Sequence, residues 1–150
     1  MKLSVFLSVL FFQISIFAST IEVVGACSEK PQFISEDISH DSTQTLGDLT
    51  VEVFDQNKVP YRGSREGISQ IFNSATGDEA IEIISDQEAR FYGWCVHVDG
   101  VEPGLMPDQV TLVNPNSKII WFYAFASVYK NEWKEMCVPA HTIKPKKFCP

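Results

Sequence analysis

The chain has 150 residues, of which 45% are apolar, and it carries a formal net charge of −7. This length is typical of one domain that can bury a core, and the composition excludes a disordered protein. The negative charge argues against nucleic-acid binding, which needs a basic stripe, and equally against binding to an anionic membrane surface. The one basic cluster, Lys144, Lys146 and Lys147, is interpreted as a solvated tail.

The N-terminus is predicted to be a signal peptide. Lys2 precedes a nearly unbroken apolar run from Leu3 to Phe17, and cleavage after Ala18 would remove residues 1–18. We therefore expect a secreted or periplasmic protein with no transmembrane span in its mature chain. The stretch before Cys27 also resembles a bacterial lipobox, so a lipid anchor at Cys27 is the alternative.

Four cysteines follow the predicted cleavage site: Cys27, Cys95, Cys137 and Cys149. Export implies an oxidising compartment, and an even number of cysteines fits two disulfides with three possible connectivities. We favour Cys95–Cys137, which would staple the centre of the chain, and Cys27–Cys149, which would tie its two ends. An acylated Cys27 would leave one cysteine without a partner.

The first half of the mature chain is predicted to contain the helix. Residues 19–46 are expected to form an extended N-terminal arm, because residues 28–48 are polar with few apolar positions. Residues 49–54 alternate apolar and polar, which predicts a half-buried strand, and Pro60 limits the next short strand to an edge. A helix is then expected from Ser64 to Ala75, with Gly77 as its stop.

The second half is predicted to be strands. They are expected at residues 80–84, 93–98, 108–113 and 117–127, separated by turn residues such as Asp99-Gly100. One helix crossing one face of a mixed sheet describes an α+β fold of β-grasp type. Residues 47–150 are accordingly predicted to form a β-grasp-like domain with a disulfide-linked C-terminal extension.

Two phrases in this half carry a family resemblance. Gly93-Trp94 followed by Val98-Asp99-Gly100, and then Ser117, Ile119, Trp121 and Tyr123, resemble the transcobalamin-like C-terminal domain family over about residues 49–123. The family pattern has Asn in place of Asp99 and Gly-Asp in place of Asn116-Ser117. The resemblance implies a β-grasp fold. A cobalamin-like ligand is implied by the resemblance only, since the helical domain of the vertebrate cobalamin carriers is absent.

Chemical motifs are weak throughout the chain. Cys95, His97, Cys137 and His141 could bind zinc, but the spacing is uncommon and export favours disulfides. The carboxylates are unclustered in sequence, and no phosphate-binding loop, nucleophile elbow or zinc-protease motif is present. We therefore expect no catalytic residue, no metal and no cofactor.

The candidate ligand site is an aromatic row. Alternation places Trp121, Tyr123 and Phe125 on one face of a strand, and the smaller residues between them are expected beneath the helix. An uncovered aromatic row could bind a small molecule or an extracytoplasmic protein. The alternative is that Trp133 and Phe148 fold over the row and make it core.

The function that we predict is a secreted or periplasmic, non-catalytic binding module for a small molecule or a protein partner. The alternatives are an envelope lipoprotein with a structural role and a small extracytoplasmic hydrolase. A hydrolase would need its scattered carboxylates or histidines to meet in a cleft.

Overall fold

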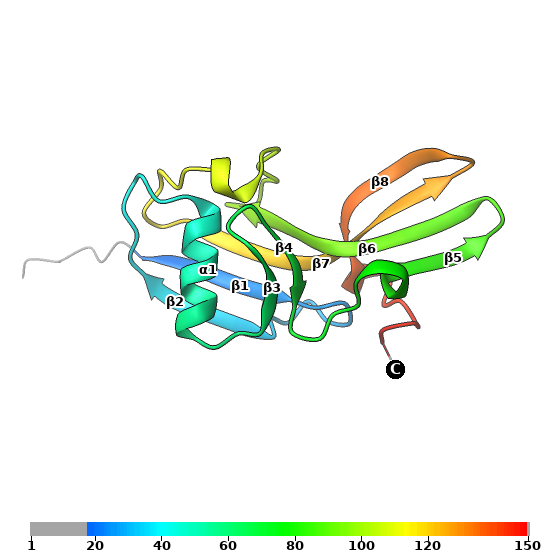
Figure 1. Cartoon of the computed structure of the whole chain (residues 1–150), viewed down its shortest axis with the longest axis horizontal. Helices are drawn as coiled ribbons and strands as arrows, with labels where there is room; N and C mark the ends of the chain where they lie inside the picture. Colours follow the sequence, from blue (N-terminus) through cyan, green and yellow to red (C-terminus); the bar gives the residue numbers. More distant parts are fainter. Residues whose placement is uncertain (1–17, 150) are drawn as a thin grey trace, which may run out of the picture.

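The computed structural model describes residues 18–149, which form a mixed sheet with one α-helix on it (Figure 1). The predicted leader, apart from Ala18, and Pro150 lie outside the described residues. The elements in chain order are β1 (Ser19–Val24), β2 (Phe33–Ile38), α1 (Leu46–Gln56), β3 (Tyr61–Ser64), β4 (Gly67–Ile71), β5 (Ile81–Ser85), β6 (Glu88–Val98), β7 (Lys118–Tyr129) and β8 (Glu132–Pro139), with short 3₁₀ turns at Gly77–Ala80, Pro107–Gln109 and Ala140–Thr142.

The main sheet has six strands in the order β2-β1-β7-β6-β5, with β8 also pairing to β7. β1 runs parallel to β7, and the other neighbouring pairs are antiparallel. β6 lines one edge of β7 along its whole length, while β1 and β8 occupy successive halves of the other edge. The predicted α+β class, with a β-grasp-like mixed sheet, one crossing helix and a disulfide-linked C-terminal extension, is confirmed.

The position of the helix was predicted wrongly. Residues 49–54 belong to α1 and do not form a strand. The Thr45 hydroxyl accepts a hydrogen bond from the Asp48 N–H at 3.1 Å and donates one to the Asp48 carboxylate at 2.7 Å, which caps the helix. Leu46, Leu49 and Val53 then recur at helical spacing and are buried. The short alternation that indicated a strand was weaker than this cap and stripe.

The predicted helix from Ser64 to Ala75 is a β-hairpin. β3 pairs antiparallel with β4, with a register shift next to Gly63, whose φ is +133°. A side chain at Gly63 would run into the backbone of Gly67, so only glycine allows this close approach. The predicted helix would have buried Ile68 and Ile71. Both residues are indeed buried, but they reach the core from the bulged hairpin.

The N-terminal segment is also part of the sheet and is not an extended arm. Ile21 and Val23 of β1 are fully buried next to β7, and β2 extends the sheet by one strand. The expected strand at residues 108–113 is reduced to a 3₁₀ turn and an isolated bridge between Thr45 and Thr111. The strands predicted at 80–84, 93–98 and 117–127 correspond to β5, β6 and β7, with ends that differ by a few residues.

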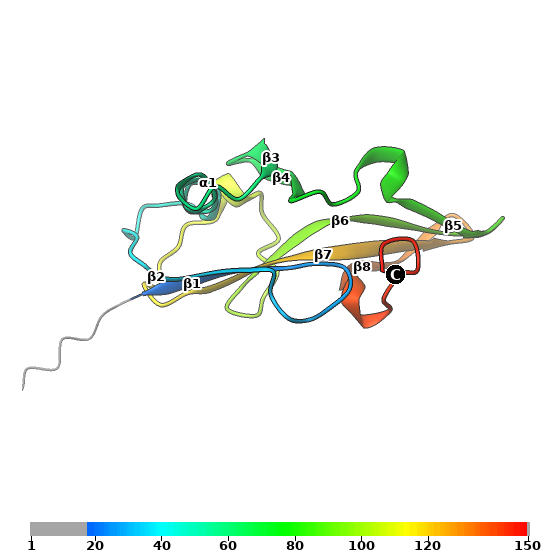
Figure 2. The same cartoon turned by 90° about the horizontal axis from the view of Figure 1, so that it is seen from below.

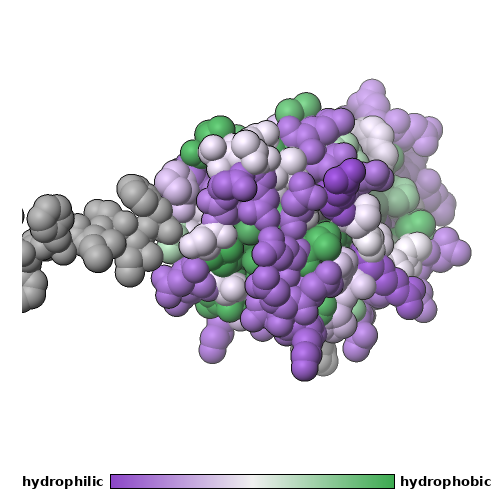
Figure 3. Space-filling view, turned by 60° about the vertical axis from the view of Figure 1, so that its left-hand side comes forward, coloured by the Kyte–Doolittle hydropathy of each residue, from purple (hydrophilic) through white to green (hydrophobic). Residues whose placement is uncertain are grey.

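One core holds the layers together. α1 and the β3–β4 hairpin lie on the same face of the sheet (Figure 2), and the buried residues of α1 pack against β1, β6 and β7. The end of the molecule near α1 and β2 is covered mainly by hydrophilic residues, with hydrophobic residues only in small separate patches (Figure 3). This end is therefore a solvated surface, and the hollows described below lie elsewhere.

Candidate functional site

The predicted aromatic row is buried. Trp121, Tyr123 and Phe125 are 2%, 2% and 3% exposed. The row lies on the face of the sheet that α1 covers: the Trp121 indole N–H donates a hydrogen bond to the hydroxyl of Thr50 at 3.1 Å. Tyr123 and Phe125 lie farther along this face, in a cluster with Tyr92 and Ala140. The expectation that the helix covers the other face of β7 is wrong. Strand alternation separates two sets of side chains, but it does not say which set the helix covers.

The smaller residues of β7 pack beneath a disulfide instead. Phe122 and Ala124 form a separate buried cluster on the opposite face, together with Cys95 and Cys137. The Cys95–Cys137 bond joins β6 to β8 across this face. The Cys95–Cys137 bridge thus packs on this face, where the helix had been predicted.

Phe148 supplies part of the cover for the row, and Trp133 does not. The Phe148 ring meets Tyr92 and Tyr123 edge to face, with ring centroids 4.8 and 5.7 Å apart. Trp133 is 60% exposed and contacts Phe91 near the tip of the β7–β8 hairpin. The C-terminal segment therefore covers the aromatic residues with Phe148, and with Val138 and Ala140, which pack in the same cluster.

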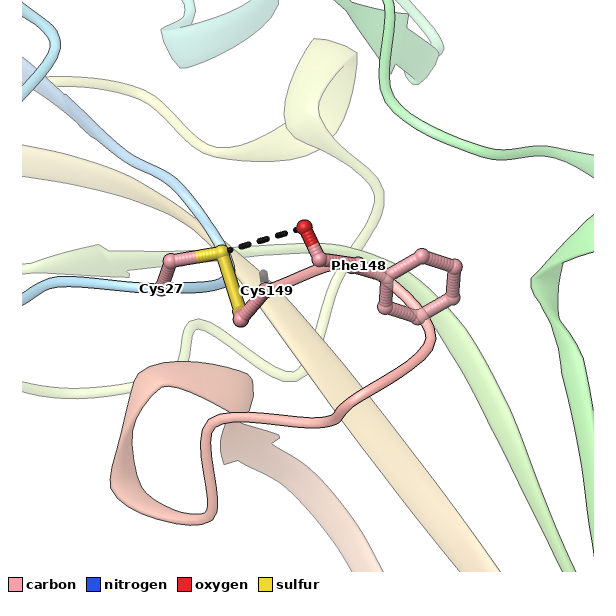
Figure 4. Close-up of a disulfide and its surroundings, with 3 residues drawn as sticks. All are labelled: Cys27, Phe148 and Cys149. Atoms are coloured by element: carbon pink, nitrogen blue, oxygen red, sulfur yellow. Dashed lines mark hydrogen bonds between the residues drawn. A yellow bond between two sulfur atoms is a disulfide. The ribbon is translucent and has the colours of Figure 1, made fainter.

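The second disulfide holds Phe148 in this position. Cys27 after β1 is bonded to Cys149, which follows Phe148 directly, so the bond ties this end of the chain to the segment after β1 (Figure 4). The Cys27 sulfur also lies 3.4 Å from the Phe148 carbonyl oxygen; because the bonded sulfur carries no proton, this is a contact only. Both favoured disulfides are thus present, and the second one fixes a wall of a hollow.

That hollow, which we call the aromatic groove, has a volume of about 430 Å³. Trp94, Tyr123 and Phe148 line it, and Gln32, Asn73, Ser74 and Glu79 provide polar side chains. The Trp94 indole N–H donates to the Ser74 hydroxyl at 2.9 Å, and the Tyr123 hydroxyl donates to the Ala75 carbonyl at 2.9 Å. Both aromatic residues therefore use their polar atoms internally and turn ring surface toward the groove.

Burial also fixes the charge state of Tyr123. Removal of its phenol from water raises the pKa of Tyr123 from 10.0 to about 12. The hydroxyl therefore stays neutral even at pH values where an exposed tyrosine ionises, and it remains a hydrogen-bond donor to Ala75. This bond and the Trp94–Ser74 bond hold the segment Ile71–Ala75 over the sheet. The segment forms one wall of the groove.

A second hollow, the edge groove, has a volume of about 550 Å³ and follows the outer edge of β6. Its lining includes Trp94, Val96, Ile68 and Trp121, with Leu105 and Met106 from the segment between β6 and β7. A third and smaller hollow includes Phe125 and Met136 in its lining.

The three predicted ligand residues are thus divided among three hollows: Tyr123 lines the aromatic groove, Trp121 the edge groove and Phe125 the smallest one. Trp94 lines all three and was missed as a site residue. The signal for it was present in the Gly93-Trp94 pair that carried the family resemblance.

The cysteines considered as zinc ligands or as a nucleophile are not available for either role. Cys95 and Cys137 lie close to the carboxylate of Glu102, but both sulfurs are in a disulfide and offer no thiolate to a metal. His97 packs its ring against Phe122, with centroids 4.6 Å apart. Neither cysteine is therefore available as a zinc ligand or nucleophile.

Glu82 lies in a polar group on the sheet. It accepts a hydrogen bond from the Tyr92 hydroxyl at 2.6 Å and lies 3.6 Å from the Arg90 guanidinium. Burial, followed by this bond, raises the pKa of Tyr92. Arg90 also lies over the ring of Phe125. The group links β5 to β6, and its members are engaged with one another.

Comparisons with known proteins add little. No protein-family model matches this chain, and neither does any curated protein sequence. Among solved structures, the crystal structure of a "putative metal binding protein" from Ruminococcus gnavus aligns with 71% of this chain and 94% of that chain, at 18% identity and a TM-score of 0.43. A likeness at this level assigns neither a family nor a ligand.

Within residues 18–149, no helix has the length and apolar character needed to cross a membrane.

Proposed function

We propose that this chain is an extracytoplasmic, non-catalytic binding module, related to the transcobalamin-like C-terminal domains, whose ligand is a small molecule with a flat apolar face. The observation that carries the proposal is the convergence of Trp94, Tyr123 and Phe148 on one groove with polar side chains beside them. Small-molecule sites typically combine aromatic walls with a few polar groups that fix orientation. The β-grasp arrangement is the fold that the resemblance implies, and it supports the relationship.

The polar groups of the groove indicate what the ligand should carry. Within the described residues, the side chains of Gln32, Asn73 and Glu79 form no internal hydrogen bond, while those of Trp94 and Tyr123 are already paired. A ligand would therefore stack its ring surface on Trp94 and Phe148 and direct hydrogen-bond donors to Glu79. A neutral or cationic ring with an amino group meets this description, whereas an anionic group would be repelled.

Secretion after loss of residues 1–18 is the second part of the proposal. The Cys27 sulfur, which a lipid anchor would need, is bonded to Cys149, and two disulfides fit an oxidising compartment. Intact-mass measurement of the mature protein tests this part. We expect the mass of a chain that starts at Ser19 and carries no lipid. Additional mass from acyl chains on Cys27 would support the lipoprotein alternative.

Indole N–H resonances provide a direct test of the site, because the chain has three tryptophans in three environments. Trp94 lines the groove, Trp121 is 2% exposed and Trp133 is 60% exposed. We would titrate the ¹⁵N-labelled protein with a panel of aminated aromatic fragments and nucleobases, monosaccharides and cyanocobalamin. A saturable shift confined to the Trp94 signal is expected for aminated rings.

Matched variants make this test specific. Phe148→Ala removes one wall of the groove and should weaken fragment binding at least fivefold, whereas Trp133→Ala removes an aromatic ring outside the groove and should leave binding unchanged. If no panel member shifts the Trp94 signal, or if both variants bind equally well, the proposed site is wrong.

A further inference from the structure

Half of β6 has a neighbour on one side only. β5 pairs with residues 88–91 of β6, whereas β7 pairs with β6 from Glu88 to Val98. The stretch 93–97 therefore has no strand partner on the side away from β7, between β5 and the bridge that joins Val98 to Val101 (Figure 1). An open edge presents unpaired backbone groups to its surroundings.

The direction of these backbone groups follows from hydrogen bonds at the end of β6. The Asp99 N–H donates to the carbonyl of Lys118 at the start of β7. The Val98 N–H and carbonyl instead bond to Val101, on the outer side. The register between β6 and β7 is continuous, so even-numbered residues direct their backbone groups outward. This places the N–H and C=O groups of Trp94 and Val96 on the open edge.

These four groups are unpaired. Throughout residues 18–149, no hydrogen bond outside the strand ladders involves the backbone of Trp94 or Val96, and no strand pairs with them on the outer side. They also border the edge groove, whose volume of about 550 Å³ leaves space beside the strand. Alternate donors and acceptors in a row are complementary to an extended chain.

The walls of the edge groove define the side chains that such a chain should carry. Leu105 and Met106 are 60% and 54% exposed and offer apolar surface. The charged residues in the lining are Glu66 and Glu102, and no lysine or arginine lines the groove. An extended segment with apolar residues and at least one lysine or arginine would be complementary in both respects.

We propose that the β6 edge binds an extended, basic segment of another protein, which adds to the sheet as a strand beside Trp94 and Val96. The site differs from the aromatic groove, and the proposal does not depend on it. A second copy of this chain is the less suitable occupant, because pairing two β6 edges would bring Glu66 and Glu102 of both copies together. The partner is therefore foreign and basic at the contact.

Hydrogen exchange tests the premise in the free protein with an internal control. The amide protons of Trp94 and Val96 should exchange at least tenfold faster than those of Cys95 and His97, which point to β7. Equal protection of all four amides would show that the edge is closed, and the proposal would fail.

A designed peptide tests the binding. The probe is a short acetylated peptide of alternating valine and lysine, with two controls: the same peptide with glutamate for lysine, and one N-methylated along the edge that would face β6. The lysine peptide should bind saturably below about 1 mM, the range of weak complexes, and should slow exchange at Trp94 and Val96. Both controls should fail to do so.

Charge variants then test the assignment of the walls. Glu66→Gln and Glu102→Gln should each weaken peptide binding about two- to fivefold, as exposed ion pairs do, and added salt should remove this difference. Glu36→Gln, an exposed site on β2 outside the edge groove, is the matched control and should have no effect. Absence of saturable binding, equal binding of the N-methylated peptide, or self-association of the protein through β6 would each overturn the proposal.

Discussion

Replacement of Trp121 by Phe tests the burial of the aromatic row. Trp121 is 2% exposed, and its indole N–H donates to Thr50, which is fully buried in α1. The change removes one hydrogen bond, worth about 1 kcal/mol, and two buried ring carbons, worth about 0.8 kcal/mol each. With a small contribution from the cavity left in the core, the free energy of unfolding should fall by about 3 kcal/mol.

Denaturant unfolding measures this loss, and a double-mutant cycle separates its parts. Thr50→Val keeps the shape of the side chain but removes the hydroxyl, so the coupling between the two changes should be about 1 kcal/mol. Acrylamide quenching supplies an independent readout. The emission lost in Trp121→Phe should be protected from the quencher, and the emission lost in the control Trp133→Phe should be accessible, because Trp133 is 60% exposed.

Two results would refute this reasoning. If the emission lost with Trp121 is accessible to the quencher, the row is open and α1 does not cover it. If the free energy of unfolding falls by less than about 0.5 kcal/mol, the value of an ordinary surface change, the indole is not held against Thr50 as described.

Three further predictions follow from the core. Ile71→Ala should lower the free energy of unfolding by about 2–5 kcal/mol, because Ile71 is fully buried in β4; an unchanged denaturation midpoint would contradict this. In an exposed helix, replacing glycine by alanine stabilises the helix by about 1 kcal/mol. Gly47→Ala should instead destabilise the protein, because a Cβ there would overlap the Arg65 carbonyl oxygen. A raised melting temperature would count against the packing of α1 on the hairpin. The raised pKa of Tyr123, about 12 against an ordinary 10.0, should give stability that is complete below pH 10 and lost as the pH rises to 12. Over this range wild type should lose roughly 2–3 kcal/mol relative to Tyr123→Phe, and parallel pH profiles would show that the phenol is not buried.

The sheet was partly predictable from the sequence, and the helix was not placed correctly. The turn after Val98 and the aromatic, β-branched runs of β6 and β7 are local signals, so their strands were found. The cap formed by Thr45 and Asp48 is also local, but the alternation at residues 49–54 predicted a strand where α1 lies. The Ile68–Ile71 spacing fits both a helix and a bulged hairpin, and tertiary packing decided between them.

The site depended on contacts that no local pattern records. Phe148 contacts Tyr123 next to the bond between Cys149 and Cys27, which spans a sequence separation of 122 residues. Which side of the sheet α1 covers depends on the path of the chain after β2. The alternation of side chains along β7 gives no information about that path. Trp94 gained its central place because the segment Ile71–Ala75 folds over it, which the predicted helix did not allow.

A crystal structure of the mature protein, soaked with the aminated aromatic fragment that binds most tightly, tests the central claim most directly. The account predicts density for the fragment ring against Trp94 and Phe148 in the aromatic groove, with its amino group within hydrogen-bond distance of Glu79. Density for the fragment elsewhere on the molecule, with the aromatic groove empty, would contradict the account.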